Sequence, residues 1–252
     1  MPAGRASLPE VSVILPTYNE KDNIEPLIKA VRKHTPRRTE VIVVDDDSPD
    51  GTWRLVERLA KKDKNIRLLR RTGERGLTSA LRDGIRLSRG RICVWMDCDL
   101  SMPPEKIPDL LDLIRRGFDI AVGSRYLPGG GVEIISGGPD SLTAYIFSLF
   151  LNRYLRFVLG SWFTDWTSGF IAVRRKVLER IPLRGGYGEY FIDLVYRARK
   201  LGFRLREIPY LCRARRAGSG KTFVNPFDFL KKGWRYFILS LRLRLTKIAG
   251  ND

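Results

Sequence analysis

Residues 41–52 read VIVVDDDSPDGT, a run of four β-branched apolar residues that ends in three aspartates and a turn. Such a run, bounded by turn-forming residues, is typical of a buried strand. Residues 92–105 repeat this arrangement as ICVWMDCDLSMPPE. Each stretch places carboxylates directly after an apolar strand. This pairing predicts a layered α/β fold with a polar site at one edge of its sheet.

Outward from these two stretches, short apolar runs alternate with amphipathic segments. Strands spaced by helices in this way predict an α/β fold, with a mostly parallel sheet flanked by helices. We expect a catalytic domain over residues 1–225 and a C-terminal amphipathic helix within residues 226–252. The expected strands are residues 11–15, 41–44, 66–69, 92–96, 120–122, 170–173 and 205–208. The expected helices are residues 23–33, 52–61, 77–87, 142–160 and 190–201, one that Pro103 and Pro104 open, and the tail from residue 226.

The charge balance of the chain is strongly basic. Its 252 residues include 46 Lys and Arg against 28 Asp and Glu, a formal net charge of +18. Such a field favours anionic partners, whether nucleic acid, anionic lipid or phosphorylated ligands, and composition does not choose among them. Three cysteines without regular spacing argue against a disulfide framework and a zinc site. The single histidine, His34, excludes any site that needs two.

Two segments predict contact with a membrane surface without passage through it. The apolar residues 142–163 are interrupted by Arg153 and Arg156, so their uncharged part is shorter than the roughly 20 residues of a spanning helix. The tail from residue 226 interleaves aromatic residues with cations, as interfacial helices on anionic bilayers do. Alternatively, both segments simply pack on the core. Residues 1–10 lack a secretory signal pattern, and we expect peripheral attachment at the cytoplasmic face of a membrane.

The spacing of Asp97 and Asp99 is suited to a metal ion. Two carboxylates separated by one residue can converge on one hard cation, and oxygen ligands favour Mg²⁺ or Mn²⁺. A second acidic cluster, residues 45–47, follows another strand. Massed carboxylates repel one another unless a cation or a donor-rich ligand offsets them. The alternative is that these aspartates cap the turns that follow them.

Five motifs then occur in chain order. They are PTYNE (16–20), VDDDSPDGT (44–52), MDCDLSMPPE (96–105), GSRY (123–126) and DWTSGF (165–170). Together they resemble the family 2 glycosyltransferases of GT-A fold, and within them the dolichol-phosphate mannose synthase branch. The resemblance implies an inverting enzyme that uses Mg²⁺ or Mn²⁺ to move a sugar from a nucleotide sugar, GDP-mannose by default, to dolichyl or polyprenyl phosphate. It also implies contact with membrane lipids, a partner subunit in the membrane in some members, and no nucleic acid.

The resemblance implies roles for individual residues as well. Asp97 and Asp99 would hold the metal, Asp46 would flank the base of the donor, and a basic loop would close over the phosphates. The residues implied to bind the donor and its metal are Pro16, Tyr18, Glu20, Val44, Asp46, Asp97, Cys98, Asp99, Ser101, Arg125, Arg213, Arg215 and Lys221. Those implied at the reaction centre are Asp99, Arg125, Asp165, Arg215 and Lys221.

The chain departs from the family pattern at three places. Ser101 stands where the family often has glutamine, residues 134–152 contain no Lys or Arg, and the spacing within the basic loop is altered. Ser101 therefore replaces a possible ligand of the metal or phosphate. The missing cations remove part of the expected site for the acceptor phosphate, and the altered spacing affects the alignment of Arg215 with the family. The sequence GSGKT (218–222) does not meet the spacing of a phosphate-binding P-loop.

Other functions remain open at this stage. A glycosyltransferase that acts on a hydroxyl of a glycan, protein or other lipid would need a base carboxylate, for which Asp165 and Asp193 are the candidates. A basic nucleic-acid-binding protein would show salt-dependent affinity, but both acidic clusters would then have no purpose. A catalytically silent homologue is the third alternative, and Ser101 and the missing arginine are its only signs.

Overall fold

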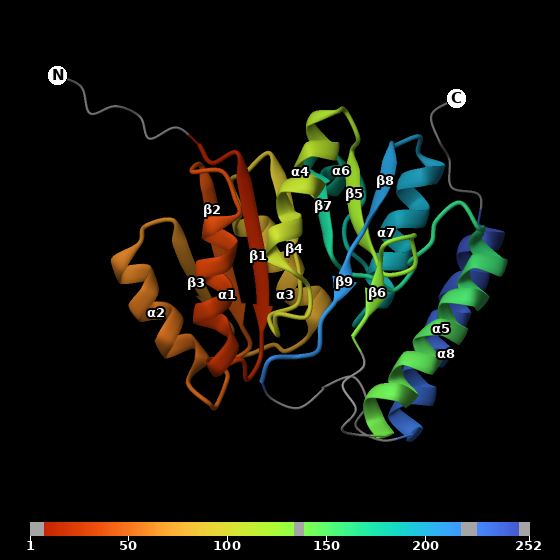
Figure 1. Cartoon of the computed structure of the whole chain (residues 1–252), viewed down its shortest axis with the longest axis horizontal. Coiled ribbons are helices and arrows are strands. Elements are labelled where there is room, and N and C mark those ends of the chain that lie inside the picture. The colour runs from red at the N-terminus through yellow and green to blue at the C-terminus, as the bar shows by residue number, and fades with distance from the viewer. Residues whose placement is uncertain (1–7, 134–138, 218–225, 247–252) are drawn as a thin grey trace.

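The computed structural model describes residues 8–133, 139–217 and 226–246 (Figure 1). The strands are β1 (Val11–Thr17), β2 (Thr39–Asp45), β3 (Ile66–Arg70), β4 (Ile92–Trp95), β5 (Ile120–Ser124), β6 (Gly131–Val132), β7 (Ile171–Arg174), β8 (Leu205–Pro209) and β9 (Leu211–Cys212). The helices are α1 (Lys21–Lys33), α2 (Thr52–Lys62), α3 (Leu77–Leu87), α4 (Ile107–Arg115), α5 (Pro139–Leu159), α6 (Arg175–Arg180), α7 (Glu189–Lys200) and α8 (Pro226–Leu245), with a 3₁₀ turn at Pro104–Lys106.

Seven strands form one sheet in the order β3-β2-β1-β4-β7-β5-β8. Only β7 runs antiparallel to its neighbours β4 and β5, so the predicted mostly parallel α/β sheet is confirmed. The elements predicted from the apolar runs are present, with ends that differ by a few residues. The short pair of parallel strands β6 and β9 and the short helix α6 were not predicted, because two-residue strands and a six-residue helix leave little pattern.

Helices cover both faces of the sheet, and the sheet separates the hydrophobic core into two layers (Figure 1). Alternate residues of β1 point to opposite faces, as strand geometry requires. Val13 and Leu15 pack in the layer with α1 and α4, whereas Ile14 packs in the layer with α3 and α7. At Gly84 of α3, a Cβ atom would lie only 2.5 Å from the Ile14 side chain, so glycine brings this helix close to the sheet.

The long helices α5 and α8 lie side by side at one end of the molecule (Figure 1). Tyr154 stacks on Phe237 with ring centroids 5.4 Å apart, and its hydroxyl lies 3.0 Å from the Ser240 hydroxyl. Large apolar side chains remain on the outer surfaces of both helices: Phe157 is 90% exposed and Trp234 is 62% exposed. Among the described residues, no helix has the length and apolar character needed to span a bilayer.

Candidate active site

Three loops meet at the carboxyl ends of the neighbouring strands β1, β2 and β4 (Figure 1). Each contains a non-glycine residue with a left-handed backbone: Asn19 at φ 53°, Asp47 at φ 57° and Leu100 at φ 65°. Among the described residues, no other non-glycine position has positive φ. Such conformations cost free energy and cluster at functional sites, where the surrounding structure maintains them. The backbone thus marks the same edge that the acidic motifs marked in the sequence.

The three aspartates after β2 have different environments. Asp45 is fully buried and accepts hydrogen bonds from the backbone and hydroxyl of Ser48 at 2.8 and 2.7 Å, so it caps the turn. Asp47 pairs with Arg70 near the surface. Asp46 is buried directly after β2, where a guanidinium and a backbone N–H bind its carboxylate.

The partner of Asp46 is Arg71, a buried arginine that sequence reasoning missed. Its Nε and Nη2 donate to Asp46 Oδ1 at 2.8 and 2.5 Å, and the backbone N–H of Gly76 donates to Oδ2 at 2.8 Å. Arg71 also donates to Ser79 and Asp83 on α3. The only available signal was its position two residues after the strand-like run 66–69, where a basic residue at a buried sheet edge needs a carboxylate partner.

Asp97 is open to the site and forms no hydrogen bond through its carboxylate within the described part of the chain, while its backbone N–H contacts the Met102 sulfur at 3.3 Å. Loss of hydration within the surrounding protein and the negative charge of Asp99 both disfavour the ionised form, and they raise the pKa of Asp97 to about 7. Asp97 also carries unused oxygen lone pairs. A bound cation would relieve both conditions, and this fits a divalent metal that takes one or two carboxylates and completes its shell with phosphates and water.

Asp99 is oriented by its neighbours. Its Oδ1 accepts hydrogen bonds from the backbone and hydroxyl of Ser101 at 3.0 and 2.6 Å, and its Oδ2 forms an ion pair with Nη2 of Arg215 at 2.9 Å. Asp99 therefore does cap a turn, and it also faces the site. Between the two aspartates, Cys98 is buried and its thiol donates to the Pro16 carbonyl at 3.2 Å, which ties this loop to the end of β1.

The basic segment 213–217 lies over these loops. Backbone N–H groups of Arg213 and Arg216 donate to the carbonyls of Ser101 and Asp99 at 2.8 and 3.1 Å. The Arg215 guanidinium bridges Glu20 at 3.1 Å and Asp99 at 2.9 Å, and the Arg213 side chain pairs with Glu105 at the rim. The structure thus brings residues from three distant parts of the chain together. Lys221 lies outside the described residues.

Arg125 and Asp165 form a buried ion pair. Nε and Nη2 of Arg125 each donate to Asp165 at 2.8 Å, the Arg125 backbone N–H adds a bond at 3.0 Å, and Nη2 also reaches Thr167. Burial by itself would lower the pKa of Arg125, but attraction to Asp165 outweighs it and raises that pKa well above its ordinary value. Glu207 accepts hydrogen bonds from the backbones of Thr164 and Asp165 and so supports this segment.

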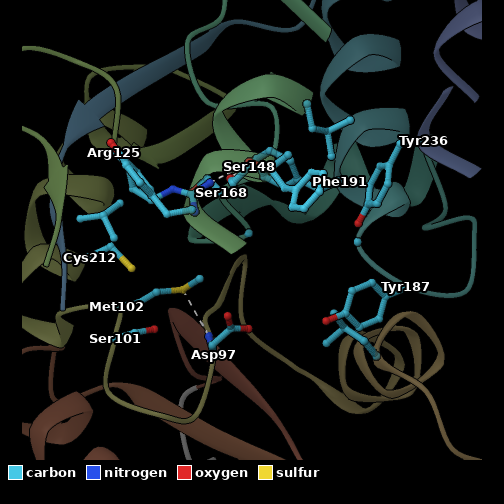
Figure 2. Close-up of a pocket in the computed structure, with 18 of the residues that line it drawn as sticks. Asp97, Ser101, Met102, Arg125, Ser148, Ser168, Tyr187, Phe191, Cys212 and Tyr236 are labelled. Carbon is cyan, nitrogen blue, oxygen red and sulfur yellow. Dashed lines mark hydrogen bonds between the residues drawn. The ribbon is translucent and has the colours of Figure 1, made fainter. Parts of the chain in front are cut away.

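A pocket of about 400 Å³ extends from Asp97 toward the paired helices (Figure 2). Its polar end contains Asp97, Ser101 and Arg125, and most of the remaining wall is apolar or aromatic. Figure 2 shows Asp97 beside Met102 and, farther along, Tyr187 and Tyr236, which come from distant segments of the chain. The residues from α5, α7, α8 and the loop before α7 are Tyr145, Phe147, Ser148, Leu151, Tyr187, Gly188, Tyr190, Phe191, Gly233 and Tyr236.

The remaining predicted donor residues lie at the same edge. Pro16 is half-buried near the end of β1, and Val44 is fully buried in β2 next to it. Tyr18 is half-buried, and the Arg75 guanidinium lies 5.0 Å from its ring centroid. Glu20 is almost fully buried and accepts a hydrogen bond from Asn23 at 2.7 Å as well as the bond from Arg215. These residues thus lie at the same sheet edge as Asp46, whose backbone N–H donates to the Thr17 carbonyl at 3.1 Å.

Comparison with known proteins shows the family to which this chain belongs. The model of the family described as glycosyl transferase family 2 matches residues 12–182, more than half of the chain. The chain is also 41% identical over 217 residues to the polyprenol monophosphomannose synthase of Mycolicibacterium smegmatis. The aligned region covers 83% of this chain and 79% of that protein. This chain belongs to glycosyl transferase family 2. It is a hexosyltransferase of the dolichol-phosphate mannosyltransferase type, as its motifs indicated.

Two further relatives of this family 2 glycosyltransferase are informative. It is 35% identical to the dolichol-phosphate mannosyltransferase of Pyrococcus furiosus over 90% of its own length, but it spans only 63% of that protein. Glucosyl-3-phosphoglycerate synthase from Mycobacterium tuberculosis, solved in complex with Mn²⁺, UDP-glucose and phosphoglyceric acid, superposes with a TM-score of 0.67 at 21% identity. That superposition covers 94% of this chain and 79% of the other, and it shows a shared GT-A fold.

Proposed function

We propose that this glycosyltransferase moves mannose from GDP-mannose to a polyprenyl or dolichyl phosphate, with inversion at the sugar carbon, at the cytoplasmic face of a membrane. The observation that carries the proposal is the pocket, which joins a polar end with Asp97 and Arg125 to an apolar part beside α5 and α8. The polar end suits a nucleoside diphosphate with its metal, and the apolar part suits a lipid tail that enters from the exposed helix surfaces. The names of the relatives point the same way.

The chemistry asks little of a general base. A lipid phosphate is largely ionised near neutral pH, because such groups titrate at roughly pH 6, and it can attack without losing a proton. Among the described residues that line the pocket, Asp97 is the only carboxylate. Asp165 and Asp193, which could serve a hydroxyl acceptor, are both buried and paired, with Arg125 and Arg197. This arrangement favours a phosphate acceptor over the hydroxyl of a glycan or protein.

Residues of the chain divide the remaining work. Asp97 and Asp99 would hold Mg²⁺ or Mn²⁺, which supplies positive charge to the leaving diphosphate. Asp46, fixed by Arg71, would accept hydrogen bonds from the base. Arg215, now bridging Glu20 and Asp99, would turn its donors to the phosphates once the cation satisfies those carboxylates. Arg125 would stabilise charge at the wall of the pocket.

The direct test is transfer of radiolabelled sugar from GDP-mannose, UDP-glucose and UDP-N-acetylglucosamine to a short-chain polyprenyl phosphate, with and without Mg²⁺ or Mn²⁺. We expect a labelled lipid from GDP-mannose only, and only with metal. A lipid product from another donor would replace the proposed sugar. Metal-dependent nucleotide binding with no lipid product from any donor would show that the acceptor is not a polyprenyl phosphate.

Replacement of Ser101 tests the orientation of the metal ligand. Ser101→Ala removes the 2.6 Å hydrogen bond from its hydroxyl to Asp99 and leaves the backbone bond in place. We expect about 10-fold weaker activation by Mg²⁺, since groups that orient metal ligands typically contribute 10–100-fold to affinity. Turnover measured against metal concentration gives the shift. Ser88→Ala, at the other end of the sheet, is the control, and equal metal curves for all three proteins would contradict the role.

The outer faces of α5 and α8 are proposed to rest on the membrane, with residues 226–252 as the principal attachment. The exposed apolar residues that support this are Ile146, Phe147, Leu149, Phe150, Phe157 and Trp162 around α5, and Trp234, Phe237, Ile238, Leu241 and Leu245 on α8. Arg235, Arg242 and Arg244 flank the latter set and suit anionic headgroups. Single exposed apolar side chains are common on soluble proteins, but a group of this size is typical of an interaction surface.

We expect Trp234→Ser with Ile238→Ser to weaken binding to phosphatidylglycerol vesicles by at least about 10-fold, because both side chains would leave the acyl boundary. Both are exposed, so stability should change little. Sedimentation with vesicles gives the bound fraction. Leu8→Ser, another exposed apolar residue but remote from both helices, is the control. Unchanged vesicle binding in the double variant would show that the outer faces of these helices do not bind the membrane.

A further inference from the structure

The sheet has a second pocket at its opposite edge, where β1 and β4 begin and β7 ends. This pocket has a volume of about 450 Å³, within the range of small-molecule sites. It lies away from the acidic loops, which follow the other ends of β1, β2 and β4 (Figure 1). Its lining residues are Leu8, Pro9, Glu10, Arg38, Arg89, Arg91, Ile92, Ile114, Arg115 and Arg174. Five arginines and one glutamate therefore surround one cavity.

These arginines are not neutralised by the protein. Within the described part of the chain, none of the five forms an ion pair with a carboxylate, and Glu10 forms none either. The side chains of Arg89, Arg91 and Arg115 have no hydrogen bond to the described protein and are exposed. Several cations gathered at one cavity repel one another, so an anion that joins them is stabilised by all of them.

The loop that presents two of the arginines is held rigidly. The backbone N–H of Arg89 donates to the buried Glu40 at 2.6 Å, and that of Gly90 donates to Ser12 at 2.8 Å. Arg175 donates to the carbonyls of Gly90 and Ser88 at 2.8 and 3.0 Å. At Gly90 a Cβ atom would lie 2.6 Å from the backbone of Ser12, so this approach requires glycine. Arg89 and Arg91 therefore leave a fixed backbone on either side of Gly90.

The other cations are also positioned. Arg174 donates from Nε to the Phe118 carbonyl at 3.0 Å and from Nη2 to the Ile114 carbonyl, which fixes its guanidinium at the end of α4. Arg38 donates to the Leu8 carbonyl at 2.7 Å. Those bonds use only part of the donor set of each guanidinium, since arginine has five N–H groups. Donors of this kind match the paired oxygens of phosphate groups in a bidentate manner.

We propose that this pocket is a binding site for a small anion that carries two or more phosphate groups, separate from the catalytic pocket. Arg89, Arg91 and Arg115 supply the free guanidinium groups, and Arg38 and Arg174 complete the positive wall. Ile92, Ile114 and Pro9 give the cavity an apolar part against which the rest of such an anion can pack. The site needs no divalent metal, because arginines provide the counter-charge. Nothing in this inference depends on the sugar or acceptor proposed for catalysis.

Calorimetric titration of the full chain with inorganic tripolyphosphate, in EDTA, tests the proposal. We expect one saturable site, and at least about 10-fold weaker binding in Arg89→Ser/Arg91→Ser, because two guanidinium groups that can donate charge-assisted hydrogen bonds to the phosphates are lost. Those side chains make no described contact within the protein, so thermal melting should not change. The matched control is Arg58→Ser/Arg82→Ser, which removes the same charge from exposed positions on α2 and α3. It should bind as the wild type does.

Two further arms locate the site and the source of the phosphate. Arg215→Ala should keep tripolyphosphate binding, because Arg215 lies over the acidic loops at the other edge of the sheet, paired with Glu20 and Asp99. Phosphatidylglycerol vesicles should bind the wild type and Arg89→Ser/Arg91→Ser equally. If both double variants lost tripolyphosphate affinity equally, the net charge of the protein would explain the binding, and the proposal would be overturned. Loss in Arg215→Ala alone would place the anion in the catalytic pocket, and loss of vesicle binding without saturable tripolyphosphate binding would assign the arginines to lipid headgroups; either result overturns it too.

Discussion

Asp97→Asn is expected to reduce sugar transfer by at least about 1000-fold, because the variant loses the carboxylate that is open to the pocket and free to bind a cation. The amide has the same shape, and no described hydrogen bond depends on the carboxylate, so the fold should persist. Replacement also removes a negative charge beside Asp99, so thermal stability in EDTA should be equal or higher. Steady-state transfer with saturating metal, together with thermal melting, measures both effects.

The control for this variant is Asp109→Asn. Asp109 is an exposed carboxylate on α4 that pairs with Lys106 at the surface, and its loss should leave transfer unchanged. Asp99→Ala should behave like Asp97→Asn in transfer, but it also removes the partner of Ser101 and Arg215. Unaltered turnover in Asp97→Asn would remove this residue from the metal site. Added Mn²⁺ that restored full activity would show weakened binding in place of a lost ligand.

Asp165→Asn is expected to lower the free energy of unfolding by about 3–5 kcal/mol, the usual effect of removing one partner from a buried ion pair. Asp165 is fully buried, and Arg125 would keep its positive charge with no carboxylate beside it. The backbone N–H bonds that Asp165 accepts from Arg125 and Thr167 would also weaken. Urea denaturation followed by circular dichroism gives the change, provided that the slope of the transition stays the same.

Asp112→Asn breaks a comparable pair on the surface and serves as the control. Its partner Arg116 is exposed, and exposed pairs contribute less than about 1 kcal/mol. Arg125→Met should also destabilise the protein, since it leaves Asp165 buried without its partner. The double variant should be less destabilised than the two single changes added together, because the pair couples them. Small and additive losses would show that water compensates both charges and that the pair does not organise the pocket.

Much of the fold followed from local pattern. The apolar runs at residues 11–15 and 41–44 were predicted to be buried strands, and both lie in the interior of the sheet as β1 and β2. The order of motifs after those strands placed the acidic residues at one edge, because parallel strands bring their carboxyl ends together. The antiparallel direction of β7 was not predictable, since direction depends on the path of the preceding segments. No local pattern records that path.

The candidate site divides in the same way. The sequence by itself determined which residue types stand at the strand ends, and so it named Asp46, Asp97 and Asp99 as site residues. Only the tertiary structure decided their partners: Arg71 for Asp46, and Arg215 for Asp99. It also joined the pocket wall from α5, α7 and α8 and gathered the arginines at the opposite edge. The physical reason is that hydrophobic periodicity is local, whereas ion pairs and cavities join residues far apart in the chain.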